Sequence, residues 1–356
     1  MTTASKCALI MAGGTGGHIF PGLAVAQALR ARGWRVHWLG APASMESRLV
    51  PPHGFALETV DFSGIRGKGL ATLLLAPLRL LRASWQSLCV MRRVRPDVLV
   101  GFGGYITLPA GLVGALSGRA LVLHEQNSVA GMANKVLAVL ARRVFTAFPH
   151  VLKKALWVGN PLRANFIGVP DPTTRFALRS GPLQVLVVGG SLGARALNEV
   201  VPRAVALIPA SERPVVIHQS GAAQIDALRA NYAQAGVQAQ LTPFIDDTAQ
   251  AFADADLVIC RAGASTVTEL AAVGAAALFV PFPSAVDDHQ THNANFLVSQ
   301  GAGWLEPQHQ LTPEKLAEML QKTERPALLS CALQAKKMEK TDATTKIVAA
   351  CEELTR

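Results

Sequence analysis

Two glycine-rich turns in the sequence contain the residue types of a phosphate-binding loop. Gly13-Gly14-Thr15-Gly16-Gly17 follows an apolar run at residues 7–12, and Gly189-Gly190-Ser191-Leu192-Gly193 follows a similar run at residues 183–188. A glycine turn between a strand and a helix lets the backbone approach a ligand closely and points unpaired N–H groups at it, which suits a diphosphate. Two such turns predict a ligand bound between two halves of the chain. The alternative for each turn is a plain tight turn that binds no ligand.

The spacing of these glycines disfavours the two commonest nucleotide-binding loops. The dinucleotide fingerprint G-x-G-x-x-G requires a glycine where this chain has Ile19, and the second expected strand leads into Gly40 without an acid for a ribose. The P-loop pattern G-x-x-x-x-G-K-[ST] is absent from the sequence. The predicted ligand is therefore neither NAD nor the nucleoside triphosphate of a P-loop protein.

Two further clusters follow expected strands of the first half. Gly101-Phe102-Gly103-Gly104-Tyr105 begins where the run at residues 97–100 ends, and His124-Glu125-Gln126-Asn127 closes the run at residues 120–123. Ligands of open α/β sheets bind outside the carboxyl ends of the strands, so we expect these clusters and the first glycine turn to line one cleft. A solvated loop is the alternative for residues 124–127.

In the second half, residues 261–269 again join an expected strand to an expected helix. Thr266 and Glu269 match a capping box, in which Glu269 would satisfy backbone donors and meet no ligand. In the alternative, the helix N-terminus faces a diphosphate and the Glu269 carboxylate accepts hydrogen bonds from two ribose hydroxyls. The spacing leaves both readings open.

A cluster of acids and histidines at residues 287–294 has the composition of a metal site. His289 and His292 are three residues apart and would need a third ligand, and the neighbouring acids suit a harder ion than imidazoles do. Polar contacts to a ligand, made from a loop after the run at residues 277–280, are the favoured interpretation.

These clusters need a framework of short strands and helices, which the rest of the pattern supplies. Short apolar runs bounded by Gly or Pro alternate with segments of helical period such as residues 21–32, and this alternation predicts βαβ units with parallel sheets. The expected strands are residues 7–12, 35–39, 97–100, 120–123 and 143–147, then 183–188, 215–218, 257–260 and 277–280. The sequence predicts an α/β chain with domains at 1–163 and 164–340, and a last helix at 343–354 that packs on either one.

Charge separates the two halves of the chain. Of its 356 residues, residues 1–163 hold 19 Lys and Arg against 5 Asp and Glu, whereas residues 164–356 hold 15 against 19. The basic half predicts an anionic partner: nucleic acid, anionic lipid or a phosphorylated substrate.

The five cysteines form no Cys-x-x-Cys pair, which disfavours a disulfide framework and a zinc site. Neither a signal peptide nor a spanning helix is expected, because the longest apolar stretch, residues 70–81, contains Pro77 and Arg79.

Residues 64–95 contain seven basic residues and no acid. In a helix after Pro77, the apolar residues Leu78, Leu81, Trp85 and Leu88 would form one stripe, and Arg79, Arg82, Gln86 and Arg93 a neighbouring one. Such a helix either lies on an anionic membrane surface or packs its apolar stripe against the core. The absence of acids favours the membrane surface.

Six ordered motifs between about residues 7 and 350 resemble the MurG family of bacterial glycosyltransferases, within glycosyltransferase family 28. They are residues 13–22, residues 103–105, residues 124–127, Gly159-Asn160-Pro161-Leu162-Arg163, residues 190–194 and residues 261–269. Members of this family move N-acetylglucosamine from its UDP donor to undecaprenyl-linked muramyl pentapeptide, converting lipid I into lipid II for peptidoglycan. The resemblance implies a GT-B fold, in which two Rossmann-like domains have parallel sheets that face a central cleft. It also implies a protein that acts peripherally at the cytoplasmic side of the inner membrane.

The resemblance also implies the site residues. On the donor side it places Arg163 and Ser191 near the diphosphate, the Ile245 backbone at the uracil, Glu269 on the ribose and Gln290 near the sugar, with Ala264, Ser265, Thr266, Val267 and Thr268 at the helix start. From the first domain it adds Thr15, Gly16, Gly17 and Asn127. Helix N-termini and Arg163 can stabilise the leaving diphosphate, so no metal or cofactor is expected.

Inverting transfer requires a general base in the acceptor domain. His18 is the first candidate because it follows the glycine turn and because histidine side chains ordinarily titrate near neutrality, and Glu125 is the second.

The sequence departs from the family pattern in two places. Gly274-Ala275-Ala276 stands where Gly-x-Pro is expected, and Ile106-Thr107 follows Tyr105 where a smaller Ser-Gly is common.

The sequence leaves three alternative functions open. A nucleic-acid-binding protein would use the basic half directly, but aromatic residues make up only 6% of the chain and no reading motif is present, so nucleic acid is not the expected partner. A non-catalytic nucleotide-sugar-binding protein would keep the glycine turns and Glu269 while releasing no UDP. A GT-B transferase for another lipid acceptor is the third alternative.

Overall fold

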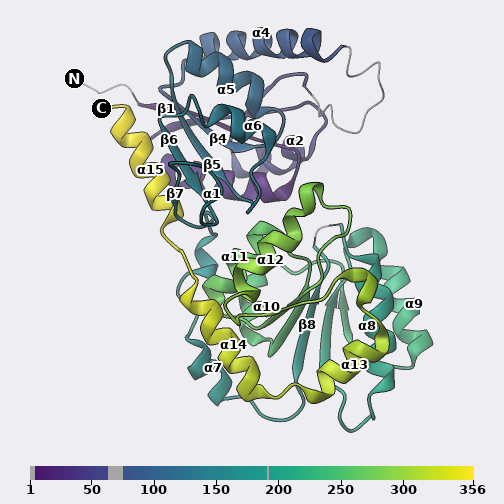
Figure 1. Ribbon diagram of the computed structural model, residues 1–356. Coiled ribbons are helices and arrows are strands. Elements are labelled where there is room, and N and C mark those ends of the chain that lie inside the picture. Colours follow the sequence, from purple (N-terminus) through teal and green to yellow (C-terminus); the bar gives the residue numbers. More distant parts are fainter. Residues whose placement is uncertain (1–4, 63–74, 191) are drawn as a thin grey trace. The chain divides into compact units, whose positions relative to one another are not determined.

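The computed structural model describes residues 5–62, 75–190 and 192–356 (Figure 1). The chain divides into two compact units, which we call unit 1 (Met1–Arg163 with Thr341–Arg356) and unit 2 (Ala164–Lys340). Each unit contains one parallel sheet with helices packed against it. The predicted α/β class, with two Rossmann-like parallel sheets, is confirmed.

The described residues of unit 1 form a seven-stranded sheet in the order β3-β2-β1-β4-β5-β6-β7. The strands are β1 (Cys7–Ala12), β2 (Arg35–Gly40), β3 (Ala56–Thr59), β4 (Val98–Gly103), β5 (Ala120–Glu125), β6 (Arg143–Thr146) and β7 (Leu156–Trp157). The central strands β1 and β4 are buried along their whole length, which explains their continuous apolar runs. The short edge strands β3 and β7 were not among the predicted strands.

The described residues of unit 2 form a six-stranded sheet in the order β10-β9-β8-β11-β12-β13. Its strands are β8 (Gln184–Val188), β9 (Val215–Gln219), β10 (Gln240–Thr242), β11 (Leu257–Cys260), β12 (Ala277–Phe279) and β13 (Trp304–Leu305). Counted from the first strand of each unit, the first six strands follow the same order in both sheets, 3-2-1-4-5-6, which is the doubly wound Rossmann order. The two halves of the chain, which begin with similar glycine turns, therefore also share the order of their strands.

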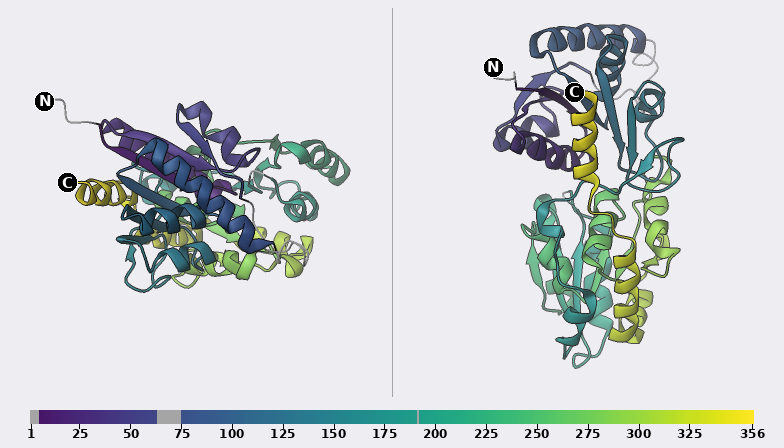
Figure 2. Two further views of the ribbon diagram at one scale, coloured as in Figure 1. Left: turned by 90° about the horizontal axis from the view of Figure 1, so that it is seen from above. Right: turned by 90° about the vertical axis from the view of Figure 1, so that its left-hand side faces the viewer.

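Alternating residues of β1 face two different cores in unit 1. Ala8, Ile10 and Ala12 pack in one cluster with residues of α1 (Gly16–Ala31) and α15 (Ala343–Leu354). Cys7, Leu9 and Met11 pack in the other with residues of α4 (Ala76–Val94), α5 (Thr107–Leu116) and α6 (Met132–Leu137). The C-terminal helix thus belongs to unit 1, where it contacts α1 (Figure 2).

Helix α1 begins five residues before the predicted start at Pro21. The Thr15 carbonyl accepts hydrogen bonds from the amides of His18 and Ile19, so Gly16 and Gly17 form the first helical turn. Proline and glycine have low intrinsic helix propensity, which is why the pattern placed this segment in a loop. Tertiary packing overrides that preference: a Cβ at Gly22 would lie 2.7 Å from the Trp38 ring, so only glycine lets the helix approach the sheet this closely.

In unit 2 the largest core cluster joins the sheet to residues of α8 (Arg195–Leu207), α9 (Ile225–Ala235), α13 (Pro313–Lys322) and α14 (Arg325–Lys337). The remaining helices include α7 (Pro172–Ala177), α10 (Thr248–Asp254), α11 (Ala264–Val273) and α12 (His289–Val298), and unit 1 also contains α2 (Met45–Leu49). None of the helices in the described residues combines the length and hydropathy needed to cross a membrane.

Candidate active site

Each sheet has one switch point, where the chain order reverses between two neighbouring strands. In unit 1 these strands are β1 and β4, and in unit 2 they are β8 and β11. The helices that follow the two strands of a switch point lie on opposite faces of the sheet, and this leaves a crevice at the carboxyl ends of the strands. The topology therefore places the first glycine turn beside residues 103–105, and the second glycine turn beside residues 261–264.

His18 contacts the first glycine turn and the glycine pair after β4. Its Nδ1 lies 3.1 Å from the Gly13 carbonyl oxygen and 3.2 Å from Thr15 Oγ1. A Cβ at Gly103, whose φ is +100°, would lie 3.2 Å from the imidazole, and one at Gly104 would lie 2.4 Å from the Gly13 carbonyl oxygen. The glycines at 103 and 104 thus let β4 approach the turn closely, and the structure brings the two predicted clusters together around His18.

Glu46 is a member of this site that the sequence patterns did not indicate. Its buried carboxylate accepts hydrogen bonds from the amides of Gly14, at 3.1 Å, and Ala41, at 2.9 Å. It therefore fixes the first glycine turn against the end of β2. The signal was weak, because Glu46 lies more than 30 residues from the turn in the short helix α2.

The quartet at residues 124–127 is not a solvated loop. His124, Glu125 and Gln126 are at most 2% exposed, and Asn127 is half-buried. His124 Nε2 lies 2.8 Å from the Gly159 carbonyl oxygen, so it donates there, and Nδ1 accepts from Gln126. Burial lowers the pKa of His124 to about 4, so this imidazole is neutral and serves to fix the end of β5.

Glu125 has its carboxylate occupied by neighbouring donors. Oε1 accepts from the Asn127 amide at 2.9 Å, while Oε2 accepts from the Gly131 amide at 3.0 Å and from Asn134 Nδ2 at 2.9 Å. These bonds shape the loop that carries Asn127. A carboxylate with three internal donors is poorly placed to take a proton from a substrate, which favours His18 over Glu125 as the base.

In unit 2 the second glycine turn packs tightly against the end of β9. Gly190 has φ +82° and Gly193 has φ +77°, and a Cβ at Gly193 would lie 1.8 Å from the Ser220 carbonyl oxygen. The turn therefore requires glycine at position 193 to reach its place over the sheet. Ser191, which the resemblance put near the diphosphate, lies outside the described residues.

The capping-box reading of Glu269 is wrong, because α11 starts earlier than that reading requires. The helix begins at Ala264 with Gly263 as its N-cap, and Thr266 already lies within its first turn. Glu269 therefore lies in the second turn, half-buried, where it cannot satisfy the backbone donors at the helix start.

Some of the other predicted residues of α11 direct their side chains into the core, and others lie half-buried at the start of the helix. Val267 is fully buried, and the hydroxyl of the buried Thr268 donates to the carbonyls of Ala264 and Ser265. These two side chains face the core. Ser265 and Thr266 are half-buried at the helix start, and Ser265 Oγ is a buried atom that has no hydrogen-bond partner among the described residues. Ala264 is itself buried and contributes only backbone.

Gln290 and Arg261 connect the strand ends beside α11. Gln290 Oε1 accepts from the amides of Ala262, at 3.3 Å, and Phe282, at 2.9 Å. The Arg261 guanidinium donates to the carbonyls of Val280 and Pro281, and burial lowers its pKa. Gln290 thus lies at the carboxyl ends of β11 and β12. In the part of the chain that the structure describes, no three His, Cys, Asp or Glu side chains gather as a metal site would.

Ile245 lies in the loop between β10 and α10, next to the exposed Phe244. The loop is held by the Thr242 hydroxyl, which donates to the Phe244 carbonyl at 2.6 Å. Phe244 and Ile245 also border a groove of about 360 Å³. This groove extends to Gln184, at the opposite end of the strands. Among the described residues that line the groove, Ile245 is the one predicted site residue, so the groove does not mark the nucleotide site. Arg163 is exposed at the end of unit 1, directly before unit 2 begins.

The fold defines the class of protein: two units, each with a doubly wound parallel sheet, form the GT-B fold of glycosyltransferases. Residues 8–146 match the glycosyltransferase family 28 N-terminal domain, and residues 184–350 match the family 28 C-terminal domain. The chain therefore belongs to glycosyltransferase family 28.

Relatives support this assignment along the whole chain. The UDP-N-acetylglucosamine--N-acetylmuramyl-(pentapeptide) pyrophosphoryl-undecaprenol N-acetylglucosamine transferase of Albidiferax ferrireducens is 74% identical over 98% of this chain and 91% of its own length. The transferase of the same name from Polaromonas naphthalenivorans is 73% identical over 98% of both chains. The crystal structure of MurG from Acinetobacter baumannii is similar with a TM-score of 0.86 and 39% identity, covering 98% of this chain and 99% of that one.

Proposed function

We propose that this chain transfers N-acetylglucosamine from UDP-N-acetylglucosamine to the 4-hydroxyl of undecaprenyl-linked N-acetylmuramyl pentapeptide, with inversion at the anomeric carbon. The observation that carries the proposal is the 74% identity, over nearly the full chain, to a transferase named for this reaction. Release of UDP that depends on the lipid-linked acceptor is its direct test.

In this proposal unit 2 binds the donor nucleotide. The second glycine turn and the first turn of α11 contribute backbone N–H groups to the diphosphate, assisted by Arg163 and the Ser265 hydroxyl. Glu269 accepts hydrogen bonds from the ribose, the Ile245 backbone pairs with the uracil, and Gln290 contacts the sugar. Two observations support this placement: Glu269 is half-buried beyond the helix start, and Ser265 Oγ has no hydrogen-bond partner among the described residues.

Unit 1 binds the acceptor and supplies the base, with Thr15, Gly16, Gly17 and Asn127 around the glycine turn. A proton on His18 Nδ1 can be donated to the Gly13 carbonyl, 3.1 Å away, which leaves the basic lone pair on Nε2. Nε2 removes the proton of the muramyl 4-hydroxyl as its oxygen attacks the anomeric carbon. The bond from that carbon to the diphosphate oxygen breaks in the same step, and UDP leaves with the electron pair.

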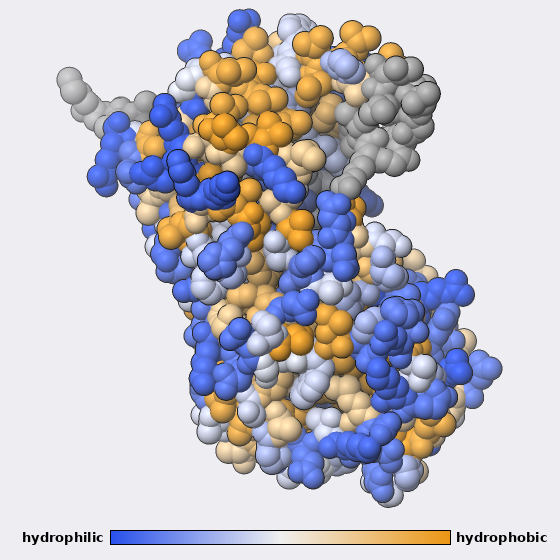
Figure 3. Space-filling view, in the orientation of Figure 1, coloured by the Kyte–Doolittle hydropathy of each residue, from blue (hydrophilic) through white to orange (hydrophobic). Residues whose placement is uncertain are grey.

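We also propose that unit 1 lies against an anionic membrane through α4. Three of the four residues of the predicted apolar stripe are exposed: Leu78, Leu81 and Trp85 are 64 to 67% exposed, and Leu88 is half-buried. Ala83, Ser87 and Val90 form the inner face of the helix. Helix α5 packs against α4 and α6, and it adds the exposed Leu116. Figure 3 shows apolar residues gathered over this part of unit 1.

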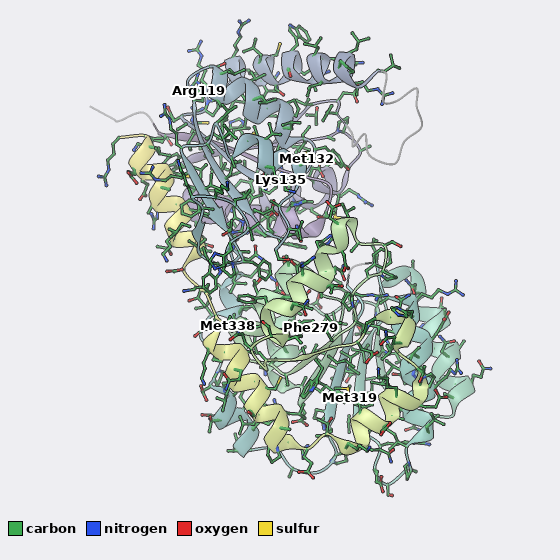
Figure 4. The ribbon with its side chains drawn as sticks, viewed as in Figure 1. Arg119, Met132, Lys135, Phe279, Met319 and Met338 are labelled. Atoms are coloured by element: carbon green, nitrogen blue, oxygen red, sulfur yellow. The ribbon has the colours of Figure 1, made fainter. Side chains whose placement is uncertain are left out.

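Cations accompany this apolar surface. Arg79 and Arg82 are exposed on α4, and on α6 the exposed Lys135 follows Met132, which is 72% exposed (Figure 4). Exposed leucine and tryptophan with interspersed cations are typical of a helix that lies in a bilayer interface. A polyprenyl-anchored acceptor stays in the bilayer, so the acceptor unit must reach that surface.

Replacing Arg79 and Arg82 with Gln and Trp85 with Ser should weaken binding to anionic vesicles on the order of 10- to 100-fold at low salt, because each cation contributes about 1 kcal/mol. Sedimentation with vesicles of mixed phosphatidylglycerol and phosphatidylcholine measures this. The matched control replaces Arg229 and Lys322 with Gln and the exposed Leu178 with Ser in unit 2, which removes the same charge and a comparable apolar side chain. Equal binding by both triple variants would contradict the proposed face, as would a parent protein that ignores anionic lipid.

A further inference from the structure

Gln219 is a buried polar residue that the mechanism above does not use. It is the last residue of β9, the strand that lies between β8 and β10, and its side chain is 3% exposed. In the sheet register Gln219 is opposite Val188 on β8 and opposite Thr242 on β10. Both of these strands lead directly into loops of the proposed donor site. Gln219 is therefore placed where those two loops begin.

The side-chain amide of Gln219 connects the two loops. Nε2 donates to the Gly190 carbonyl at 3.0 Å and to the Pro243 carbonyl at 3.0 Å. Gly190 belongs to the glycine turn, and Pro243 is two residues before Ile245. Both hydrogens of one amide are thus used to hold a diphosphate-binding segment and a uracil-binding segment at a fixed separation.

The side-chain oxygen of Gln219 indicates that fold stability alone does not explain why a glutamine occupies this position. Gln219 Oε1 is buried and accepts no hydrogen bond from the described residues. Burying an unsatisfied acceptor is unfavourable, and an apolar side chain of similar length would avoid that cost. The two donated bonds fix the orientation of the amide, because a flipped amide would direct Oε1 at two carbonyl oxygens.

The glycine turn is also anchored at a second point. Gln224 Nε2 donates to the Leu192 carbonyl at 2.8 Å, and Gln224 Oε1 accepts from Asn198 Nδ2 at 2.9 Å. Asn198 in turn contacts His218, whose pKa burial lowers to about 3, so the imidazole stays neutral inside the unit. Gln224 therefore fixes the glycine turn to the core, and Gln219 connects the turn to the loop between β10 and α10.

We propose that Gln219 is a positioning residue for the donor nucleotide: it sets the separation between the glycine turn and the β10–α10 loop, so that diphosphate and uracil are bound together. This inference rests on the proposed function, because it assigns the two loops to the two ends of UDP. A ligand that spans both loops should depend on Gln219, and a ligand that occupies one loop should not.

The test compares UDP with uridine as probes, using calorimetry for UDP and competition for uridine. Gln219→Met removes both donors at similar length and should weaken UDP binding on the order of 10- to 100-fold, since the ligand must then bring the two loops to their proper separation at the expense of binding energy. Uridine affinity should change less than twofold. In turnover assays the KM for UDP-N-acetylglucosamine should rise more than kcat falls. Gln219→Asn keeps the amide but is one methylene shorter, so it should show the same pattern and serves if the Met variant does not fold.

Thr323→Val is the matched control, because the Thr323 hydroxyl donates to the Met319 carbonyl at the end of α13, outside the hydrogen bonds that hold the two loops. It should lower the melting temperature without changing UDP affinity. The proposal is overturned if UDP binding survives Gln219→Met and Gln219→Asn, if uridine and UDP affinities weaken equally, or if Thr323→Val weakens UDP binding as much as the Gln219 variants do. A parent protein that binds no UDP would instead contradict the proposed function.

Discussion

His18→Ala should reduce turnover on the order of 10²- to 10⁴-fold while UDP affinity stays within twofold of the parent, because removal of a general base affects the chemical step alone. The imidazole is half-buried between the first glycine turn and Gly103, and its Nδ1 is within hydrogen-bonding distance of the Gly13 carbonyl oxygen. Steady-state kinetics with a saturating acceptor, together with calorimetry of UDP, separate the two quantities.

His53→Ala is the matched control for this variant. His53 is exposed, belongs to the same unit and lies outside the proposed site, so its loss should leave turnover unchanged. Near-normal turnover of His18→Ala across pH 6 to 9 would contradict the assignment and transfer the role to Glu125 or another group.

The second large effect is expected at Glu269. Glu269→Gln keeps the shape of the side chain and removes its charge, so UDP affinity should fall by about 1.5 to 3 kcal/mol, the range of a hydrogen bond to a charged group. The melting temperature should change little, because Glu269 lies beyond the first turn of α11 and does not cap it. Glu318→Gln, an exposed position on α13 that pairs with Lys322, is the control for the substitution itself.

A second ligand makes this test specific for the ribose. The parent should bind UDP more tightly than 2′-deoxy-UDP, and the Glu269→Gln variant should lose most of that difference. Unchanged UDP affinity combined with a lowered melting temperature would leave Glu269 with a structural role only.

The sequence predicted the strands that carry the site because their residues are buried on both faces of a parallel sheet. Such strands appear as continuous apolar runs, and the boundaries of β1 and β11 match the runs at residues 7–12 and 257–260. Edge strands such as β3 and β10 are half-buried and only three or four residues long, so they left no comparable run. The glycine turns were recognisable for a different reason, since few other residues tolerate positive φ.

What the sequence did not determine depends on partners distant in the chain. Whether His124, Glu125 and Gln126 are solvated or buried depends on the Gly159 carbonyl and on Asn134, which the local pattern does not contain. Glu46 supports the first glycine turn from another helix, and Gln219 connects two loops that only the sheet brings together. The start of α11 at Ala264 depends on where the turn after β11 closes, and this start excludes the capping-box reading of Glu269.

The most direct test of the proposed reaction is the release of UDP after addition of the acceptor. The purified protein is incubated with UDP-N-acetylglucosamine in detergent micelles, with and without undecaprenyl-linked muramyl pentapeptide, and both UDP and the lipid product are quantified. We predict UDP release only with the acceptor, in equal amount to a product heavier by one N-acetylglucosamine and joined with inverted anomeric configuration. Binding of UDP without acceptor-dependent release would contradict the account and leave a nucleotide-sugar-binding protein, and release at the same rate without acceptor would contradict it as well.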